Sequence, residues 1–374
     1  MSVGNFKNAL FICNEKFLDP AIPGGGVKFC TDEYISLIKT GFNIFEFPVK
    51  YRYSFLRKIK RKLNLHGYED YFINDYSKQL KSFLAEKNID YVFLNLTNTA
   101  AFAKLIKSMS ASIKVILCSH GNESGDYLHD ISKHEKYLGY KKTSAIYNLG
   151  NMLLQEAEFR KYIDLVLTVS DVEERIEKWL GAKAVYMVPR FIEKNKNIYE
   201  PIEGKVGFIS DLSHEPNYFG MQQLCKALST QDYKNLQIVL VGGGEERGKE
   251  LENKYAFVKY LGYLAEQKLA EETASWTFAL NPVFYFSRGV STKLGKTLGM
   301  GYPVITTKIG MRGYEWTDGK LPMVEDPQQM ANEILSLAFS KDQWHFYHNE
   351  VFKIQQSSAS YQSMMSNIMK LLNS

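Results

Sequence analysis

Short apolar runs alternate with stretches of helical periodicity along most of the chain, and this alternation restricts the fold more than any other feature. Segment 27–39, for example, has helical spacing and is followed by Gly41 as a C-terminal cap. Strands that alternate with helices usually pair in parallel and are covered by helices on both faces. The pattern therefore predicts an α/β fold. The predicted strands are 9–13, 43–49, 91–96, 115–119, 165–169, 184–188, 206–209, 236–241, 258–261, 277–281 and 304–306.

The chain has 374 residues, which is too long for one ordinary hydrophobic core, so two domains are expected. The strand and helix series stops in a polar stretch at 193–203 and then begins again. We expect an N-terminal domain at 1–192 and a C-terminal domain at 203–345. A helical segment at 346–374 follows, with an apolar face around Met364.

Composition excludes several classes of protein. The chain is 45% hydrophobic and 23% charged, with a modest net charge of +5, as in globular proteins that do not bind nucleic acid. Its four cysteines share no C-x-x-C spacing, so they are predicted to be reduced core thiols and not a metal site. Neither a signal peptide nor a membrane-spanning run is predicted, so a cytoplasmic location is expected.

The stretch 288–307 carries the strongest chemical signal. Gly289 lies in a loop ahead of a short helical segment, and Arg288 and Lys293 place two positive charges at its start. Unpaired N–H groups and the positive end of a helix dipole suit phosphate oxygens. The stretch predicts a diphosphate site, although two surface cations on a loop would give the same residues.

A second glycine-rich turn, Gly242 to Gly248, has the spacing of a dinucleotide fingerprint. That fingerprint requires an acidic residue at the end of the following strand, and 260–262 supplies none. A nicotinamide enzyme is therefore disfavoured.

The stretch 288–304 also resembles a pattern of two-domain (GT-B) glycosyltransferases, R-x-G-x-x-x-K-x-x-E-x-x-x-x-G-x-P-V, which precedes a T-x-x-G-x-x-G loop, here 307–313. Segments 208–217, 238–244 and 260–263 resemble other parts of the same family, the GT4-like (glycosyl transferases group 1) superfamily. The resemblance implies two Rossmann-like domains facing across a cleft, with a C-terminal helix that crosses back to the N-terminal domain.

The resemblance also implies the function and the site. It implies transfer of a sugar from a nucleotide diphosphate sugar to a glycan or lipid-linked glycan in bacterial-type polysaccharide synthesis, with retention and without a metal or cofactor. The expected catalytic residues are His120, Arg288 and Lys293. The expected donor-binding residues are Gly25, Gly26, Gly243, Gly262, Tyr263, Gly289, Val290, Ser291, Thr292 and Lys296.

Two of these expectations rest on local position in the N-terminal domain. His120 ends a predicted strand and enters a polar loop at 121–126, where it would either touch the donor sugar or serve as a structural residue. An inverting enzyme would instead need a general base, for which Glu123, Asp126 and His120 are candidates. The loop 24–26 either approaches the diphosphate or is a plain turn.

Lys296 departs from the family pattern, because a glutamate that accepts hydrogen bonds from ribose hydroxyls is expected in its place. A lysine can only donate. Either the donor is unusual, such as a deoxyribonucleotide or an anionic sugar, or the chain is a degenerate homologue that acts as a glycan-binding or partner-transferase scaffold.

A basic window at 50–63 contains seven lysines and arginines and no acidic residue, with Phe55, Leu56 and Ile59 at helical spacing. Such a segment either lies on an anionic membrane, here the inner face of the cell membrane, or forms an ordinary solvated face.

Overall fold

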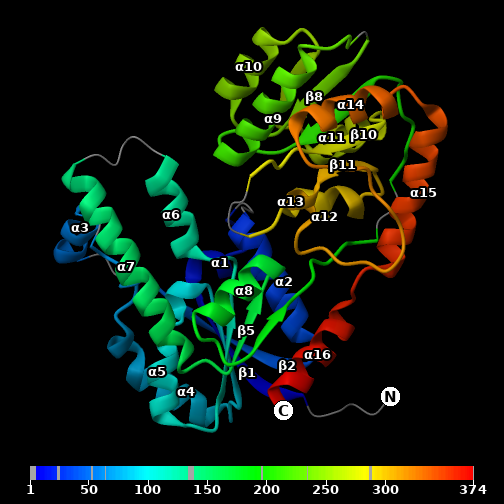
Figure 1. Cartoon of the computed structure of the whole chain (residues 1–374). Helices are drawn as coiled ribbons and strands as arrows, with labels where there is room; N and C mark the ends of the chain where they lie inside the picture. Colours follow the sequence, from blue (N-terminus) through cyan, green and yellow to red (C-terminus); the bar gives the residue numbers. More distant parts are fainter. Residues whose placement is uncertain are drawn as a thin grey trace. The chain divides into compact units, whose positions relative to one another are not determined.

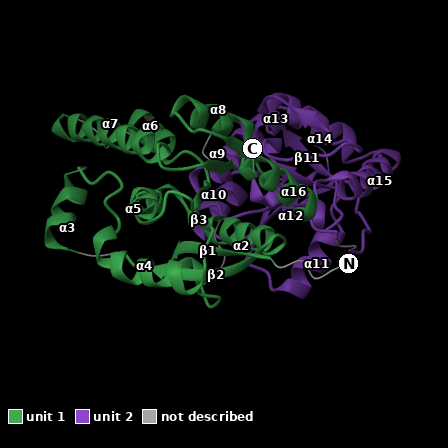
Figure 2. Ribbon diagram, turned by 90° about the horizontal axis from the view of Figure 1, so that it is seen from below, with its two compact units in different colours: residues 1–189, 360–374 green, residues 190–359 purple. Residues whose placement is uncertain are grey.

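The structure is a computed structural model that describes residues 6–22, 26–51, 54–63, 65–133, 139–194, 197–233, 235–285 and 289–373. The chain forms two compact units, coloured separately in Figure 2. Unit 1 contains Met1–Pro189 and Ser360–Ser374, and unit 2 contains Arg190–Ala359.

Unit 1 is built on a parallel sheet in the order β2-β1-β3-β4-β5-β6 (Figure 1). The chain passes from β1 to the neighbouring β2 and then crosses back over β1 to β3, so the direction of winding changes between β1 and β3. The strands are β1 (Lys7–Asn14), β2 (Phe42–Val49), β3 (Tyr91–Asn95), β4 (Lys114–Cys118), β5 (Leu165–Thr168) and β6 (Val185–Met187).

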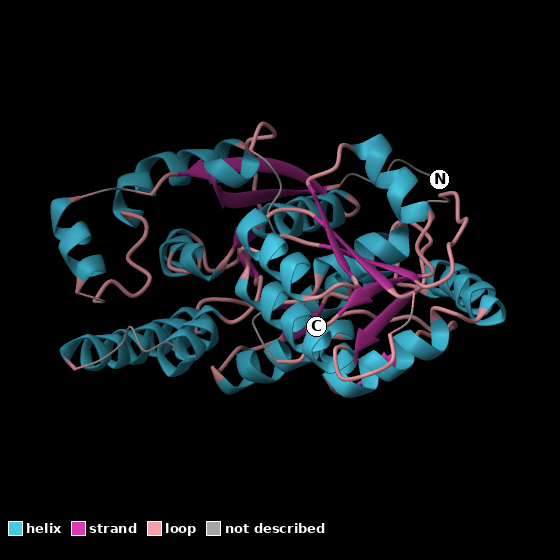
Figure 3. Ribbon diagram, turned by 90° about the horizontal axis from the view of Figure 1, so that it is seen from above, coloured by secondary structure: helices cyan, strands magenta, loops and turns pink. Residues whose placement is uncertain are grey.

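The central strands β3, β4 and β5 of the unit 1 sheet are almost completely buried. Figure 3 shows the helices of the chain in cyan and the strands in magenta. Leu80 of α4 and Phe102 of α5 share one apolar core with Leu10 and Val92 of the sheet. The helices are α1 (Glu15–Leu18), α2 (Gly26–Lys39), α3 (Phe55–Lys62), α4 (Ser77–Glu86), α5 (Phe102–Met109), α6 (Glu123–Lys133), α7 (Tyr140–Arg160) and α8 (Asp171–Trp179), with short 3₁₀ turns at Ile73–Tyr76 and Thr97–Thr99.

Unit 2 repeats this plan with a parallel sheet in the order β12-β11-β10-β7-β8-β9. Here the direction of winding changes between β7 and β10. The strands are β7 (Lys205–Ile209), β8 (Gln237–Val241), β9 (Val258–Gly262), β10 (Phe278–Asn281), β11 (Val304–Thr307) and β12 (Met323–Val324). The helices are α9 (Glu215–Leu228), α10 (Glu245–Lys254), α11 (Glu266–Ala274), α12 (Thr292–Gly299), α13 (Lys308–Met311), α14 (Pro327–Leu337) and α15 (Lys341–Ser357).

Both faces of the unit 2 sheet are buried, in separate apolar cores. Ile238 and Leu240 of β8 face one core, and Val239 and Val241 face the other, as the two-residue period of a strand requires. The first core includes residues of α9 and α14, and the second includes residues of α12 and α15. Helices α9 and α12 therefore lie on opposite faces of the sheet.

The C-terminal helix α16 (Tyr361–Asn373) belongs to unit 1, as the fold expected from the sequence requires. Its buried face includes Met364, Met365 and Ile368, and it packs on α2. Gly41, directly after α2, leaves room for this contact, because a Cβ there would lie 2.6 Å from the Met365 side chain. The division differs from the expected one in one respect, since α15 is part of unit 2.

The predicted strands agree with the observed ones to within about one residue at most ends, but strand β12 and several helices, α6 and α7 among them, were not predicted. The segment after His120 is not a loop as far as 126, because α6 begins at Glu123 with Asn122 as its cap. The 21-residue helix α7 also follows a sequence without a clear apolar stripe.

A substitution at Gly207 tests the close packing inside unit 2. A Cβ at this position in β7 would lie 2.0 Å from the ring of Trp276, which is buried and donates a 2.9 Å hydrogen bond to Glu272. We expect Gly207→Ala to destabilise unit 2 by about 1–3 kcal/mol, as overpacking does. Calorimetry should show a fall in Tm of about 2–4 °C for each kcal/mol.

Gly150→Ala is the matched control. Gly150 is exposed on α7, and a Cβ there meets nothing within 4 Å. Alanine should stabilise this helix by about 0.5–1 kcal/mol. Equal effects of the two substitutions would show that the Gly207–Trp276 contact does not limit packing.

Candidate active site

The strongest candidate site lies in unit 2, where the winding direction changes between β7 and β10. Ligands of open α/β sheets bind at the carboxyl ends of the strands at such a point. Helix α9 begins after β7, and α12 begins after β10. Lys293 in the first turn of α12 donates a 2.7 Å hydrogen bond from Nζ to Oδ1 of Asn217 in the first turn of α9. This contact joins the two helix starts.

Lys293 has no carboxylate partner in the part of the chain that the structure describes. Among the described residues, its ammonium contacts the Asn217 amide and lies 5.4 Å from the centre of the Phe208 ring. Burial lowers the pKa of Lys293 from 10.5 to about 8. A partly desolvated ammonium without an opposite charge is stabilised when an anion binds beside it. The N-terminal end of α12 adds the positive end of a helix dipole at the same place.

Hydrogen bonds to Asn281 and Tyr314 hold the start of α12 in place. Ser291 donates from Oγ to the buried Asn281 at the end of β10, over 2.8 Å. The Tyr314 hydroxyl donates to the Ser291 carbonyl, at 2.7 Å, and accepts from the N–H of Gly295, at 2.9 Å. A Cβ on Gly295 would lie 2.7 Å from that hydroxyl, so glycine is required there.

The loop expected to bind the diphosphate has a left-handed backbone conformation at Gly289, which favours glycine. Gly289 has φ +71°, and its carbonyl accepts a 2.7 Å hydrogen bond from Nε of Arg312. Val290 and Thr292 are partly buried beside it. Arg288, one of the expected catalytic residues, lies outside the described residues.

The glycine turn after β8 lies at the same edge of the sheet and packs closely on the loop after β7. Gly242 has φ +133°, and a Cβ there would lie 2.1 Å from the carbonyl oxygen of Ser210. A Cβ on Gly243 would lie 2.9 Å from the Asp211 carboxylate. Close approach of the loop after β7 therefore explains both glycines without a ligand, and their role at a nucleotide base stays a prediction.

Three further expected donor-binding residues lie on exposed surface or at a turn. Gly262 ends β9 with φ +68°, and Tyr263 beside it is 87% exposed. Lys296 is exposed on the last turn of α12, one turn after Lys293. None of the three has a described contact that shows what it binds.

In unit 1, His120 lies at the carboxyl end of β4, as expected, and is buried. Its Nε2 is 2.8 Å from Oδ1 of Asn95, at the end of β3. The Asn95 amide donates to Oγ1 of Thr31, at 3.0 Å, so its oxygen is the atom that faces the histidine. His120 therefore carries its proton on Nε2. Tyr34 of α2 packs against the ring, with centroids 5.5 Å apart.

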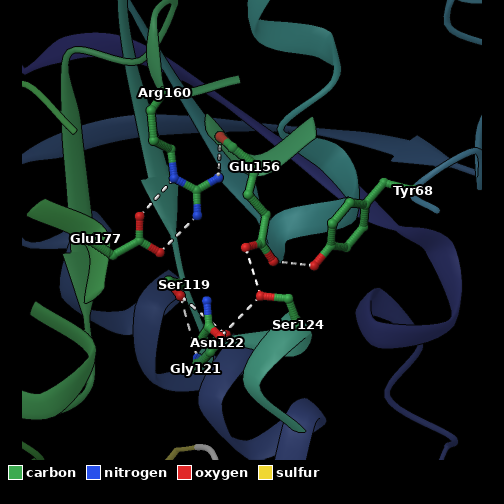
Figure 4. A network of polar contacts seen from close by, with 8 residues as sticks. All are labelled: Tyr68, Ser119, Gly121, Asn122, Ser124, Glu156, Arg160 and Glu177. Atoms are coloured by element: carbon green, nitrogen blue, oxygen red, sulfur yellow. Dashed lines mark hydrogen bonds and ion pairs between the residues drawn. The ribbon is translucent and has the colours of Figure 1, made fainter. Parts of the chain in front are cut away.

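A buried polar network holds the segment after His120 (Figure 4). The Glu156 carboxylate on α7 accepts hydrogen bonds from the hydroxyls of Tyr68 and Ser124, and it is fully buried. Oδ1 of Asn122 caps α6 by accepting from the N–H of Gly125, at 2.5 Å. The network fixes the turn between β4 and α6, and no motif in the sequence indicated it.

The other N-terminal expectations receive less support. Gly25 lies outside the described residues. Gly26 is exposed as the first residue of α2, and a Cβ there would meet nothing within 4 Å, so no steric reason requires glycine. Within the described residues there is no cluster of three metal-ligating His, Cys, Asp or Glu side chains, and no helix is long and apolar enough to cross a membrane.

Comparison with known proteins agrees with this architecture. Residues 203–339 match the family described as Glycosyl transferases group 1. These residues lie within unit 2. The match confirms the resemblance drawn from the sequence for these residues, which include Lys293. No curated protein matches the chain significantly.

Solved structures extend the likeness to the GT-B fold of the whole chain. Sucrose-phosphate synthase from Thermosynechococcus elongatus has a TM-score of 0.67 at 14% identity, with 98% of each chain covered. Anabaena HepE in complex with UDP and glucose has a TM-score of 0.61 at 13% identity, and the lipopolysaccharide outer core galactosyltransferase WaaB has 0.61 at 12%. Both comparisons cover 98% of this chain and 99% of the other.

The depressed pKa of Lys293 predicts a pH dependence of stability. Between about pH 8 and 10.5 the unfolded chain holds more protons at this residue than the folded protein, so stability rises with pH through that window. Lys293→Met removes this partly buried charge. We expect a higher Tm than wild type at pH 7 and a difference that shrinks towards pH 10.

Lys308→Met is the control for this experiment, because Lys308 is exposed and paired with Glu325. It should leave the difference between pH 7 and pH 10 as in wild type. A Lys293 variant that is less stable than wild type at pH 7 would show that the cation is already compensated.

Proposed function

We propose that the chain transfers a sugar from a nucleoside diphosphate sugar to a hydroxyl of a glycan or lipid-linked glycan. The observation that carries this proposal is Lys293 at the start of α12, a partly buried cation that bonds to the Asn217 amide and has no carboxylate partner among the described residues. The match of residues 203–339 to glycosyl transferases group 1 supports the same chemistry.

The donor diphosphate is assigned to the start of α12. Fixed positive charge at a departing diphosphate stabilises the transition state, because negative charge grows there as the glycosidic bond breaks. Lys293 supplies such a charge, and Gly289, Ser291 and Thr292 supply backbone and hydroxyl groups next to it. Arg288 is proposed as a second cation from its place in the sequence.

The proposed reaction proceeds with retention and without a metal. The bond from the anomeric carbon to the diphosphate oxygen breaks, and a bond from the acceptor oxygen to the same carbon forms. The acceptor proton passes to the leaving diphosphate. His120 is a proposed contact of the sugar, since it lies at a strand's carboxyl end, where ligands of such sheets bind.

The similar structures indicate which substrates to try first. HepE was solved with UDP and glucose, and WaaB is named as a lipopolysaccharide galactosyltransferase. UDP-hexoses are therefore the first donors to test, and surface polysaccharide or glycoconjugate synthesis is the proposed role.

Nucleotide binding is the direct test. We expect one of UDP, dTDP and GDP to raise Tm, since a ligand at 100 times its Kd adds about 2.7 kcal/mol. Lys293→Met should abolish the shift, and Lys308→Met should keep it. Transfer from the matching sugar nucleotide should fall about 100-fold or more in Lys293→Met and should persist in EDTA. No shift with any nucleotide would favour the non-catalytic scaffold.

Lys296 is proposed to set an unusual donor preference, because its ammonium cannot accept from ribose hydroxyls. The same thermal assay should show similar shifts for UDP and dUDP in wild type. Lys296→Glu should increase the shift with UDP only, and Lys296→Gln is the uncharged control. A strong wild-type preference for UDP that survives both changes would show that position 296 does not touch the sugar.

Peripheral membrane contact is proposed for α3. Phe55 and Leu56 are 77% and 72% exposed on this helix. Its positive charge is smaller than the sequence suggests, because Arg57 pairs with Asp70 and Lys60 pairs with Glu69. The remaining cations are Lys58, Arg61 and Lys62, all exposed; Arg52 lies outside the described residues.

Co-sedimentation with liposomes tests this contact. Replacing Lys58, Arg61 and Lys62 by glutamine should weaken binding to anionic vesicles, by up to about fivefold for each cation. Replacing the exposed Lys78, Lys81 and Lys87 should have little effect. Binding that ignores lipid charge, or that resists salt, would make α3 an ordinary solvated face.

A further inference from the structure

The long helix α7 packs on unit 1 with one face and leaves apolar side chains exposed on the opposite face (Figure 1). The buried face includes Asn148, Met152 and Glu156. On the other face, Ile146 is 54% exposed and Leu154 is 74% exposed. The described part of unit 1 therefore does not cover these two side chains.

Ile146 and Leu154 belong to a ridge that contains every fourth residue of α7. Residues four apart are neighbours on the surface of a helix. Lys142 and Gly150 on this ridge are exposed as well, and the side chain of Glu158 is 43% exposed. The ridge has a cation at one end, an anion at the other, and an apolar residue on either side of a glycine.

Gly150 is the central residue of this 21-residue helix, and no contact in the described chain requires a glycine there. A Cβ at this position would meet nothing within 4 Å. Glycine in the middle of a helix is less stable than alanine, but it lets a second backbone approach closely. The position is therefore suited to the crossing point of another helix.

We propose that this ridge binds a second copy of the chain, in an antiparallel pair of α7 helices that cross at Gly150. A two-fold axis at the crossing brings residues at equal distances before and after Gly150 opposite each other. Ile146 then contacts Leu154 of the second copy, and Lys142 reaches Glu158 of the second copy. By symmetry, each of these contacts forms twice.

The charges select the antiparallel direction. In a parallel pair, Lys142 would face Lys142 and Glu158 would face Glu158, and like charges repel. Glu158 also pairs with Lys161 on its own helix, but both side chains are exposed, so this ion pair is weak and does not block the contact. An anionic membrane would favour Lys142 and repel Glu158, so the ridge fits a second copy better than a lipid surface.

Helix packing allows this arrangement. Ridges of every fourth residue pack together when two helices cross at about −50°. A pair of single helix faces is a small interface, so we expect a weak dimer that forms in the micromolar range. The pairing involves unit 1 alone and does not depend on the proposed transfer reaction.

Sedimentation velocity of the full chain across the micromolar range tests the pairing. We expect the wild type to pass from monomer to dimer as its concentration rises. Leu154→Asp should abolish the dimer, because it would place an unpaired carboxylate against Ile146 of the second copy. Trp179→Asp is the matched control and should dimerise as wild type, because Trp179 is 73% exposed on α8, away from the ridge.

A charge exchange separates a specific contact from a defect in the helix. Lys142→Glu should weaken the dimer about tenfold, because two opposite-charge pairs become like-charge pairs. Adding Glu158→Lys should restore dimerisation, which it would not do if the first change had only damaged α7. Lys141→Glu makes the same change of charge one residue away, off the ridge, and should have little effect.

Cross-linking tests the direction of the pair. The four native cysteines are buried, so an introduced surface cysteine can be oxidised selectively. A mixture of Ile146→Cys and Leu154→Cys chains should form a disulfide-linked dimer. Either chain alone should form little, because like positions lie about 12 Å apart along the helix, beyond the reach of a disulfide.

Three results would overturn the proposal: a wild type that stays monomeric, a dimer that Leu154→Asp leaves intact, or efficient linking of Ile146→Cys to itself. Binding of a monomeric wild type to liposomes that Leu154→Asp abolishes would also overturn it and would assign the ridge to a lipid surface.

Discussion

Parallel strand pairing determines where the chemistry of this protein can be. In each unit the strands end at one edge of the sheet, and the chain must cross back over its first strand to reach the other half. At the crossing in unit 2, α9 and α12 leave towards opposite faces, as their separate cores show. Their N-terminal turns still begin at the same edge, so Lys293 can reach Asn217. Polar groups can lie at the carboxyl ends of β7 and β10, because α9 and α12 leave towards opposite faces of the sheet there.

The two units treat buried charge differently. In unit 1, burial alone would lower the pKa of Arg160, but Glu177 reverses the effect through two hydrogen bonds of 2.6 and 2.7 Å and raises it. Such a paired charge adds little net stability, but it fixes α7 against α8. Glu156, one turn earlier on α7, fixes the start of α6 through Ser124. In unit 2, by contrast, no described residue places an opposite charge beside Lys293, which is what the proposed anion site requires.

Much of the fold could be predicted from the sequence, because strand runs and glycine turns are local signals. The apolar runs 91–96 and 165–169 were recognised because the central strands of a parallel sheet are buried on both faces. Lys293 could be found from its place after Gly289. The residues that support it could not, since Asn281 and Tyr314 act through contacts with loops far along the chain. The same holds for Glu156, which the sequence shows only as one of the two acidic residues in α7.

The difference between Lys293 and Lys296 shows which part of the site the fold controls. Both lie on α12, one turn apart, but only Lys293 is drawn into the protein, where its charge raises the free energy of the empty site. Lys296 is exposed, and its hydrated ammonium costs the folded state little. A lysine in place of a glutamate is therefore tolerated by the fold, and its consequence falls on the ligand: the position has lost a hydrogen-bond acceptor and gained a positive charge. In the proposed function, the partly buried ammonium of Lys293 gains an opposite charge when the donor diphosphate binds. A change at the exposed position 296 costs the fold little, so the proposed donor preference can change there while the proposed diphosphate contact at Lys293 is kept.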